Sequence, residues 1–519
     1  MNSRSGLYPE QLTHITMRFL FLFLTTNVIA QVGPNYARPE TETPAKFKNV
    51  TWRVATPSSH LPKGEWWKIY HDSKLNELES RATSNNQELK AAIARFDQAR
   101  ATARLSRAEF FPNISLPLTA ERQGTSAQMP TPFPLNGIRY DGPAYNALMD
   151  FGWELDLWGK IRRGVEADKA NANAAADAIH NVLLGIQADV ASNYFKLRSL
   201  DIEMRLVREA VALRGEALKI AKARVLAGAG SELEQAQSET EVASAEAEIS
   251  SLQSQRDQIE NVISTLLGTS AASFRISPQS GSLANPPSLP AGVPSDLLER
   301  RPDISQAERQ LAAATARIGV AKAQFFPSIK LIGRGGFQSG DIDLLLHPDS
   351  LMWSAGPSVS IPLFAGGKNR FNLQKSKALH DEALAMYRQA FLGAVADVET
   401  SLSSLRNLST QSAAQQRARE SSERASALAK TRYESGTSPY LDVIEANRTA
   451  LITQRATAQI AGQKLVASVS LIKALGGGWT QSQANVIPVV TPDPAARSMP
   501  ENEGSGFISK VKGLFSRKK

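Results

Sequence analysis

The side chains that most often catalyse reactions or hold metals are scarce and scattered in this sequence. The 519 residues contain no cysteine, which excludes disulfides, thiolate metal sites and cysteine nucleophiles. Six histidines are present, and they form no HExxH or HxH cluster. The sequence therefore predicts no enzyme, no metal site and no cofactor.

The net charge of +9 raises the question of nucleic-acid binding. Lys and Arg are interleaved with Glu and Gln along helical stretches, and few aromatic residues accompany them. This pattern favours solvated helix faces and predicts no nucleic-acid partner.

Acidic residues in one segment, 150–158, alternate with apolar residues, which is typical of a strand with two unlike faces. The acidic or small set comprises Asp150, Gly152, Glu154 and Asp156, and the apolar set comprises Phe151, Trp153, Leu155 and Leu157. A second segment, 350–363, repeats the pattern. There the apolar set is Leu351, Trp353, Ala355, Val359, Ile361 and Leu363, alternating with Ser354, Gly356, Ser358 and Ser360.

Alternation of this kind suits a membrane β-barrel with a wet lumen, and equally a soluble half-buried hairpin. In a barrel, the lumen-lining residues would be Asp150, Glu154 and Asp156, which favour cations, and the lipid-facing or interfacial girdle residues would be Phe151, Trp153, Trp158 and Trp353. Pro117 and Pro362 lie inside predicted strands, where a missing N–H is unfavourable. Pro362 is interpreted as a strand-to-helix junction, and Pro117 has no explanation at this stage.

The two halves of the chain repeat one another. The segment 108–114, with its Phe-Phe-Pro run, recurs at 323–329, an offset of 215 residues. Gly159-Lys160 and Gly228 recur as Gly367-Lys368 and Gly436, at an offset of 208. Each half is predicted to contain a helix, two strands, a very long helix and a returning helix after a glycine turn.

Very long helices are the clearest local prediction. No proline occurs between Pro143 and Pro278 or between Pro362 and Pro439. The range Arg162 to Leu226 would form a helix of about 100 Å. Its apolar seam is Ile179, Leu183, Ile186, Val190, Tyr194 and Leu197, and the matching seam is Tyr387, Phe391, Val395, Val398, Leu402 and Leu405. These spacings predict coiled-coil packing, and the inserted strands argue against a purely fibrous coiled coil.

The N-terminus reads as a secretory signal peptide. Arg18 precedes a short apolar core, and a small residue, Ala30, ends the segment before Gln31. A short N-terminal anchor is the alternative to a signal peptide. Residues 1–16 are interpreted as an upstream start-site artefact. No other apolar stretch of 18 or more residues exists, so membrane entry would require a β-barrel. Four strands per chain cannot close a barrel, whereas two chains would supply eight strands and three would supply twelve.

The run Leu297-Leu298-Glu299-Arg300-Arg301-Pro302-Asp303-Ile304, followed by Ala307-Glu308, Ile318-Gly319 and Phe325-Phe326-Pro327, closely resembles outer membrane factors of RND-type tripartite efflux pumps. The similarity is to the OprM- and NodT-type branch of the TolC-like family, and it extends from about Val32 to Gly478. The resemblance implies a mixed α and β homotrimer. Its twelve-stranded transmembrane β-barrel would continue into a long periplasmic α-helical barrel with an equatorial domain. It also implies a periplasmic adaptor (membrane fusion) protein and an inner-membrane RND transporter as partners, together with outer-membrane lipid.

The expected organisation follows from the repeat and the resemblance. A signal peptide occupies 1–30, an N-terminal equatorial segment 31–72, and the first repeat 73–272. An equatorial linker occupies 273–302, the second repeat 303–476, and a C-terminal equatorial segment with a basic, amphipathic tail 477–519.

The resemblance also implies a gate at the periplasmic tip of the helices. By position, Leu441 would form an apolar ring and Glu445 an acidic ring, and Arg448 and Tyr433 would be locking partners. An ordinary helix-surface pair between Glu445 and Arg448 is the alternative.

Function is expected to be passive export of drugs or other small toxic compounds through the cell outer membrane. Many members of this branch carry an acylated cysteine where this sequence has Gln31, so no lipid anchor is expected. An outer-membrane duct for type I protein secretion and a soluble periplasmic coiled-coil scaffold are the alternatives.

Overall fold

The computed structural model describes residues 31–40, 65–124, 126, 141–279, 281, 283–287 and 301–477. The expected signal peptide, the residues Leu297 to Arg300 of the family-like run, and the basic tail lie outside the described residues. The chain divides into two compact units. The first contains the described parts of 1–41, 97–174 and 306–389, and the second contains those of 42–96, 175–305 and 390–519.

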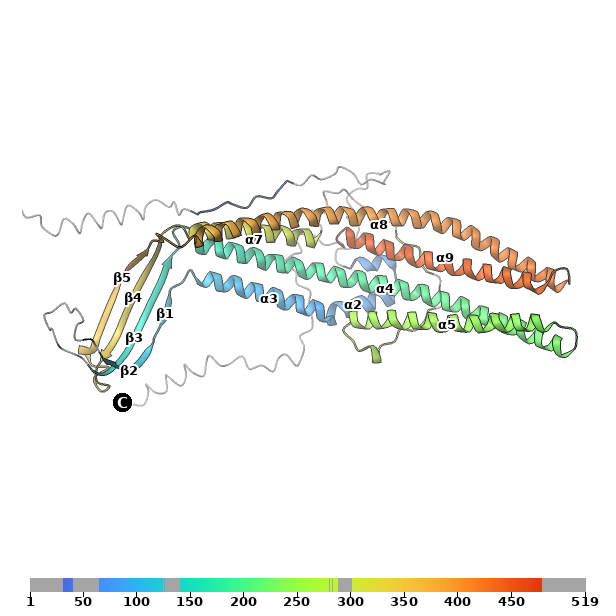
Figure 1. Cartoon of the computed structure of the whole chain (residues 1–519), viewed down its shortest axis with the longest axis horizontal. Helices are drawn as coiled ribbons and strands as arrows, with labels where there is room; N and C mark the ends of the chain where they lie inside the picture. Colours follow the sequence, from blue (N-terminus) through green and yellow to red (C-terminus); the bar gives the residue numbers. More distant parts are fainter. Residues whose placement is uncertain are drawn as a thin grey trace, which may run out of the picture. The chain divides into compact units, whose positions relative to one another are not determined.

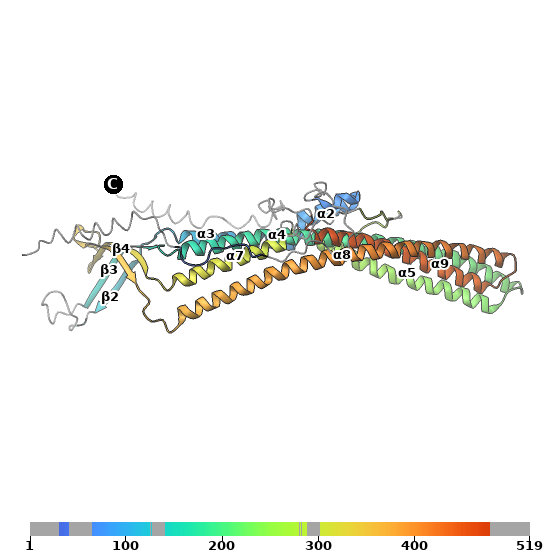
Figure 2. The same ribbon diagram turned by 90° about the horizontal axis from the view of Figure 1, so that it is seen from above.

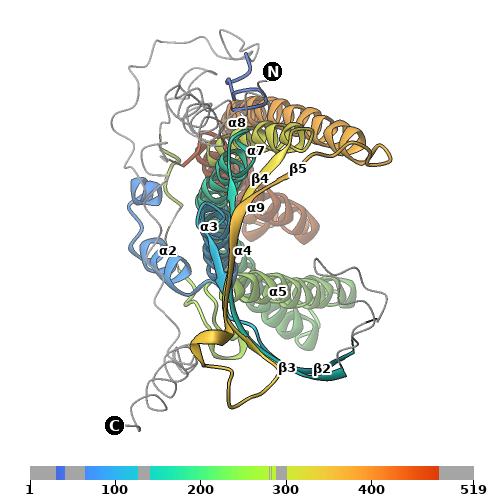
Figure 3. The same ribbon diagram turned by 90° about the vertical axis from the view of Figure 1, so that its left-hand side faces the viewer.

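The first unit contains one antiparallel sheet, whose strands are labelled in Figure 1. Its strands are β1 (Asn113–Ser115), β2 (Leu118–Gly124), β3 (Asp141–Leu155), β4 (Ser328–Ser339) and β5 (Leu351–Ser360). β1 and β2 both pair with β3, β3 pairs with β4, and β4 pairs with β5. Seen end-on, the sheet is a curved layer (Figure 3).

Pro117 separates β1 from β2. Ser115 pairs with Asp150 and Leu118 with Ala147, so both short strands follow one continuous register along β3. The strand is interrupted only at 116–117, because proline has no N–H to donate to the ladder. Pro117 still contributes its carbonyl, which accepts the Leu148 N–H at 3.4 Å.

The register gives the sheet one polar and one largely apolar face. The polar face includes Asn113, Ser115, Thr119, Asn146, Asp150, Glu154, Ser328, Lys330, Arg334, Gln338, Ser354 and Ser358. The opposite face includes Ile114, Leu118, Met149, Phe151, Trp153, Leu155, Leu331, Phe337, Leu351, Trp353 and Val359. Much of that apolar face is exposed, and Trp353 is 77% exposed.

Three pairs of helices have equal lengths. α3 (Gln87–Ala108) and α7 (Pro302–Ala323) have 22 residues each, and α4 (Lys160–Leu226) and α8 (Lys368–Glu434) have 67 each. α5 (Glu232–Leu266) and α9 (Tyr440–Ala474) have 35 each. The long helix predicted from Arg162 to Leu226 is α4, which begins two residues earlier, at Lys160. No described helix is both long and apolar enough to cross a membrane.

In the second unit, α4 with α5 and α8 with α9 form two helical hairpins (Figure 2). Each hairpin turns at a glycine, Gly228 or Gly436, with φ of 68° and 73°. A left-handed glycine satisfies the last helix carbonyls. Accordingly, the Ala229 N–H bonds the Arg224 carbonyl, and the Thr437 N–H bonds the Arg432 carbonyl, each at 2.9 Å.

The main core of the second unit surrounds the short helix η1 (Trp66–Tyr70) and the helix α2 (Ser73–Asn85). Trp66, Leu75 and Leu78 are fully buried there. The predicted seam of α4 packs into this core through Ile179, Ile186, Val190, Tyr194 and Leu197, all of which are buried. On α8, Tyr387, Phe391 and Val398 of the matching seam are also buried.

A buried ionic network fastens an extended segment, 274–279, to the hairpin of α4 and α5. Asp201 of α4 pairs with Arg256 of α5 at 2.8 Å and with Arg198 at 2.9 Å. Arg256 also pairs with Glu260 at 3.4 Å and donates to the Ile276 carbonyl at 2.5 Å. Because each charge has an ionic partner and further hydrogen bonds, the network holds the segment without a lone buried charge.

Candidate functional site

Two of the predicted lumen-lining carboxylates face basic residues on the neighbouring strand. Asp150 lies directly opposite Arg334, and Glu154 opposite Lys330. The Arg334 Nε atom lies 2.6 Å from Asp150 Oδ1, and Lys330 Nζ lies 3.8 Å from Glu154 Oε2. Lys160 adds a second cation at 2.9 Å from Glu154. Asp150 and Glu154 are therefore each paired with a cation, which offsets their negative charge, and their place in a lumen stays a prediction.

Asp156, the third predicted lumen residue, lies outside the sheet. β3 ends at Leu155, three residues before the end of the predicted strand. The Asp156 carboxylate accepts the backbone N–H groups of Ile161 and Arg162 at 3.1 and 2.9 Å and also pairs with the Arg162 side chain. Asp156 thus stabilises the start of α4, where unpaired N–H groups favour a nearby anion.

The predicted girdle residues occupy different environments. Phe151, Trp153 and Trp353 share the apolar face of the sheet. Trp158 lies beyond β3, where its ring stacks on Phe326 with centroids 4.9 Å apart.

The two Phe-Phe-Pro runs receive indole hydrogen bonds. Trp153 Nε1 donates to the Phe110 carbonyl at 2.9 Å, and Trp158 Nε1 donates to the Pro327 carbonyl at 2.7 Å. The repeated motif is therefore a helix-to-strand junction that is tied to β3 and to the connection after it.

The predicted locking residues join the two hairpins of the second unit near their turns. The Tyr433 hydroxyl donates to Glu234 of α5 at 2.7 Å and accepts a bond from Arg224 of α4 at 2.5 Å. Burial and the bond to Glu234 raise the pKa of Tyr433, so its hydroxyl stays protonated at neutral pH. The ring of Tyr433 also packs against Tyr440, with centroids 5.2 Å apart.

Arg448 makes the helix-surface contact considered from the sequence and a second contact that was not predicted. It pairs with Glu445 one turn earlier at 3.2 Å, and it reaches Glu241 of the other hairpin at 2.5 Å. Glu445 and Leu441 are exposed, and Leu441 is 48% exposed.

A row of glutamates on α5 was not predicted from the sequence. Glu234, Glu241 and Glu248 recur every seven residues and contact the second hairpin through Tyr433, Arg448 and Arg455, respectively. Arg448 and Arg455 are themselves seven residues apart. This matching interval is the signal that could have revealed the row, because residues seven apart share one helix face.

A family model described as outer membrane efflux protein matches residues 78–269 and 293–477. The chain belongs to the outer membrane efflux protein family. Cation efflux system protein CusC of Escherichia coli is 28% identical over 450 residues, which cover 87% of this chain and 96% of CusC. Pyoverdine export outer membrane protein OpmQ of Pseudomonas aeruginosa is 32% identical over 421 residues, covering 80% of this chain and 87% of OpmQ.

The fold is also similar to that of a solved outer membrane channel. The CmeC outer membrane channel of Campylobacter jejuni superposes with a TM-score of 0.79 at 26% identity, covering 87% of this chain and 96% of CmeC. The family consists of efflux channels rather than enzymes. This efflux protein is an outer-membrane channel of a tripartite efflux system.

The family-like run that ends at Ile304 has a structural role in this efflux protein through its described residues. Arg301 holds Asp303 through two contacts, at 2.6 and 3.0 Å, and also pairs with Asp397 of α8 at 3.1 Å. It donates further to the Ala474 carbonyl at the end of α9. The arginine therefore ties together the start of α7, the middle of α8 and the last turn of α9.

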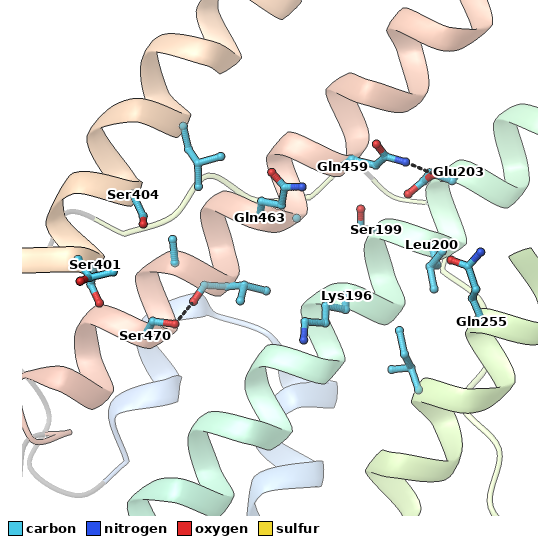
Figure 4. A pocket seen from close by; sticks show the side chains of 16 residues that line it. Lys196, Ser199, Leu200, Glu203, Gln255, Ser401, Ser404, Gln459, Gln463 and Ser470 are labelled. Carbon is cyan, nitrogen blue, oxygen red and sulfur yellow. Dashed lines mark hydrogen bonds between the residues drawn. The ribbon is translucent and has the colours of Figure 1, made fainter. Parts of the chain in front are cut away.

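A groove of about 570 Å³ lies between α4, α5, α8 and α9 of the second unit (Figure 4). Its lining mixes Lys196, Glu203 and Gln463 with serines and with aliphatic side chains, among them Leu200, Ile259 and Leu408. Gln459 Nε2 donates to Glu203 Oε2 at 2.7 Å, and burial raises the pKa of Glu203. The lining therefore offers both hydrogen-bond donors and acceptors.

Proposed function

We propose that three copies of this efflux protein close a twelve-stranded β-barrel in the outer membrane. The observation that carries the proposal is the sheet, which has one apolar exposed face, one polar face and two outer edges that pair with no other described strand. Open edges are not tolerated in lipid, so other copies must cover them. Two copies reach only the eight-strand minimum, whereas three leave a lumen wide enough for solutes.

In this trimer the polar face of the sheet lines the exit duct. Pairing of Asp150 with Arg334 leaves little net charge there, so the barrel passes solutes without strong selection by charge. The groove at Lys196 and Glu203 borders the main core through Ile259 and Val466, and it contributes to the wall of the helical part of the duct.

The duct is closed at the helix turns. Leu441 supplies an apolar ring and Glu445 an acidic ring, and Tyr433 and Arg448 hold the two hairpins of each copy together. Leu441→Ala and Glu445→Ala should each increase leak of large antibiotics such as vancomycin into cells. Leu392→Ala, at an exposed position elsewhere on α8, is the matched control. Wild-type leak in both gate variants would disprove these two assignments.

A periplasmic adaptor and an inner-membrane RND transporter deliver cargo to the duct. CusC is named for cation efflux and OpmQ for pyoverdine export, so relatives in one family are named for chemically different cargoes. The cargo of this chain is proposed to be small toxic compounds that are selected upstream by the transporter. No observation favours type I protein secretion.

The mature chain is proposed to lack an acyl anchor. SilC, a relative from Salmonella typhimurium, is named a probable outer membrane lipoprotein, whereas this sequence has no cysteine to acylate. Labelling with radioactive palmitate should leave the protein unlabelled, and a labelled band would disprove this point.

Fractionation of inner and outer membranes, followed by native and boiled electrophoresis of the detergent extract, tests the proposed function. We expect a species near three times the chain mass in the outer membrane, and the monomer after boiling. A soluble periplasmic protein would refute the barrel and favour the scaffold alternative.

A further inference from the structure

Three arginines form an exposed stripe on α3 in the first unit. Arg100, Arg104 and Arg107 are spaced four and three residues apart, which places them on one helix face. All three are exposed, and none forms an ion pair with another described residue. Phe111 extends the spacing by four residues and is 67% exposed.

The side of α3 that packs on α4 lies next to this stripe, about a quarter of a turn around the helix. Ser106 donates a short hydrogen bond to Asp168 of α4, and Ala103, one turn earlier on that side, is half-buried. The three arginines lie about 100° or more around the helix from Ser106, whereas Arg107 lies only about 40° from Ala103. The stripe is nevertheless exposed along its length. It is therefore free of the helix packing within the described chain.

The stripe runs up to the apolar face of the sheet. Phe111 is followed by Ile114 of β1, which lies on that face and is 60% exposed. The bond from Trp153 to the Phe110 carbonyl fixes the end of α3 at the same face. With a rise of about 1.5 Å per residue, Arg107 lies about 6 Å, Arg104 about 10 Å and Arg100 about 16 Å before Phe111.

We propose that Arg104 and Arg107 bind the phosphate groups of anionic phospholipids in the leaflet that faces the periplasm, with Arg100 at the margin. This inference rests on the proposed function, because it requires the apolar face of the sheet to be in lipid. The headgroup layer is about 5–8 Å thick on each side of the hydrocarbon, so Arg107, at about 6 Å, lies within it. Arg104, at about 10 Å, lies just beyond the layer, and its long side chain can extend into it.

The charge of the surroundings agrees with an anionic ligand. Guanidinium groups bind phosphate through paired hydrogen bonds, and basic clusters beside a membrane attract anionic lipid. Of the nearby carboxylates, Asp168 of α4 accepts the Ser106 hydroxyl and pairs with Arg317 at 3.9 Å. Glu109 lies on the other side of the helix, and Asp97 lies about one turn farther from the sheet than Arg100. The stripe therefore keeps its positive charge next to the apolar surface.

Lipid retention by the full-length protein tests this inference. Purified protein in non-ionic detergent is titrated with dioleoyl-phosphatidylglycerol or dioleoyl-phosphatidylcholine, and bound lipids are counted by native mass spectrometry. Arg104→Gln/Arg107→Gln should weaken phosphatidylglycerol binding more than tenfold, at roughly fivefold per arginine, and leave phosphatidylcholine binding unchanged. Arg406→Gln/Arg417→Gln, which removes two exposed charges from α8, should retain the wild-type preference.

Single variants test the geometry. Arg100→Gln should cost less affinity than Arg107→Gln, and the reverse order would overturn the placement at the headgroup layer. Unchanged phosphatidylglycerol preference in the double variant would overturn the inference, as would loss of the trimer, which would indicate a subunit contact. Outer-membrane fractionation separates the two proposals, because protein found in the outer membrane without lipid preference refutes only this inference.

Discussion

Trp66 and Trp353 show how differently the two units of this efflux protein treat apolar residues. Trp66 is fully buried in the second unit, and its indole donates to Gln187 at 3.3 Å. Trp353 is 77% exposed on the sheet of the first unit. Water drives large apolar side chains into a core, so an apolar face left open suggests surroundings that are themselves apolar.

Charged residues show the same contrast. The second unit buries Asp201, Arg256 and Glu260 in a saturated network, whereas Asp150 and Arg334 of the sheet remain partly exposed. A buried network fixes structure because its charges cannot be left alone. An exposed pair mainly sets the local charge of a surface, because solvent screens it.

The largest expected effect comes from breaking the buried network. Arg256→Met should destabilise the protein by about 3–5 kcal/mol, because it leaves the carboxylates of Asp201 and Glu260 buried without their main partner. Denaturant unfolding of the detergent-solubilised protein measures this loss. Arg334→Met, its counterpart in the sheet, should unfold like the wild type, and equal losses in both variants would remove the contrast between the units.

Truncating the buried tryptophan is expected to cost about as much or slightly less. Trp66→Ala should lower the free energy of unfolding by about 3–5 kcal/mol through the cavity it leaves. Trp353→Ala, measured in the same detergent, should change it far less, because no cavity forms on an exposed face. A large loss for Trp353→Ala would mean that another part of the protein packs on this face.

Replacing Glu79 should raise stability. This residue of α2 is fully buried, and neither carboxyl oxygen has a hydrogen-bond partner among the described residues. Burial raises the pKa of Glu79 well above its ordinary value. The protonated form therefore fits the folded state, and stability declines as the pH rises from about 4 towards the raised folded pKa.

Glu79→Met should accordingly stabilise the protein at neutral pH by about 1–3 kcal/mol and flatten this part of the pH dependence. Unfolding at pH 4 and pH 8 measures both effects. Glu77→Met, an exposed neighbour on the same helix, serves as the control. If the free energy of unfolding of Glu79→Met depended on pH as it does in the wild type, groups other than Glu79 would cause that dependence.

The smallest expected effect concerns ion selectivity of the barrel. Arg334→Gln leaves Asp150 without its partner, so planar-bilayer recordings should show a modest shift towards cations. Asp150→Asn should shift selectivity towards anions. Identical reversal potentials in both variants and the wild type would show that this pair does not face the conducting path.

Local patterns in the sequence were enough to predict the long helices, their seams and the two-faced strands. Helix and strand periodicity depends on near neighbours in the chain, so Tyr194 on the α4 seam and Trp353 on the apolar strand face could be read directly. The Phe-Phe-Pro runs also marked both helix-to-strand junctions.

Only the tertiary structure decided which side chains meet across long separations. Arg334 and Lys330 were not expected to neutralise Asp150 and Glu154, because the register between β3 and β4 joins residues 184 and 176 positions apart. Pairing of Tyr433 with Glu234 likewise required the two hairpins to lie side by side. Pattern within a strand or helix fixes which face a residue occupies, whereas its partner depends on strand register and helix packing, which form only when the chain has folded.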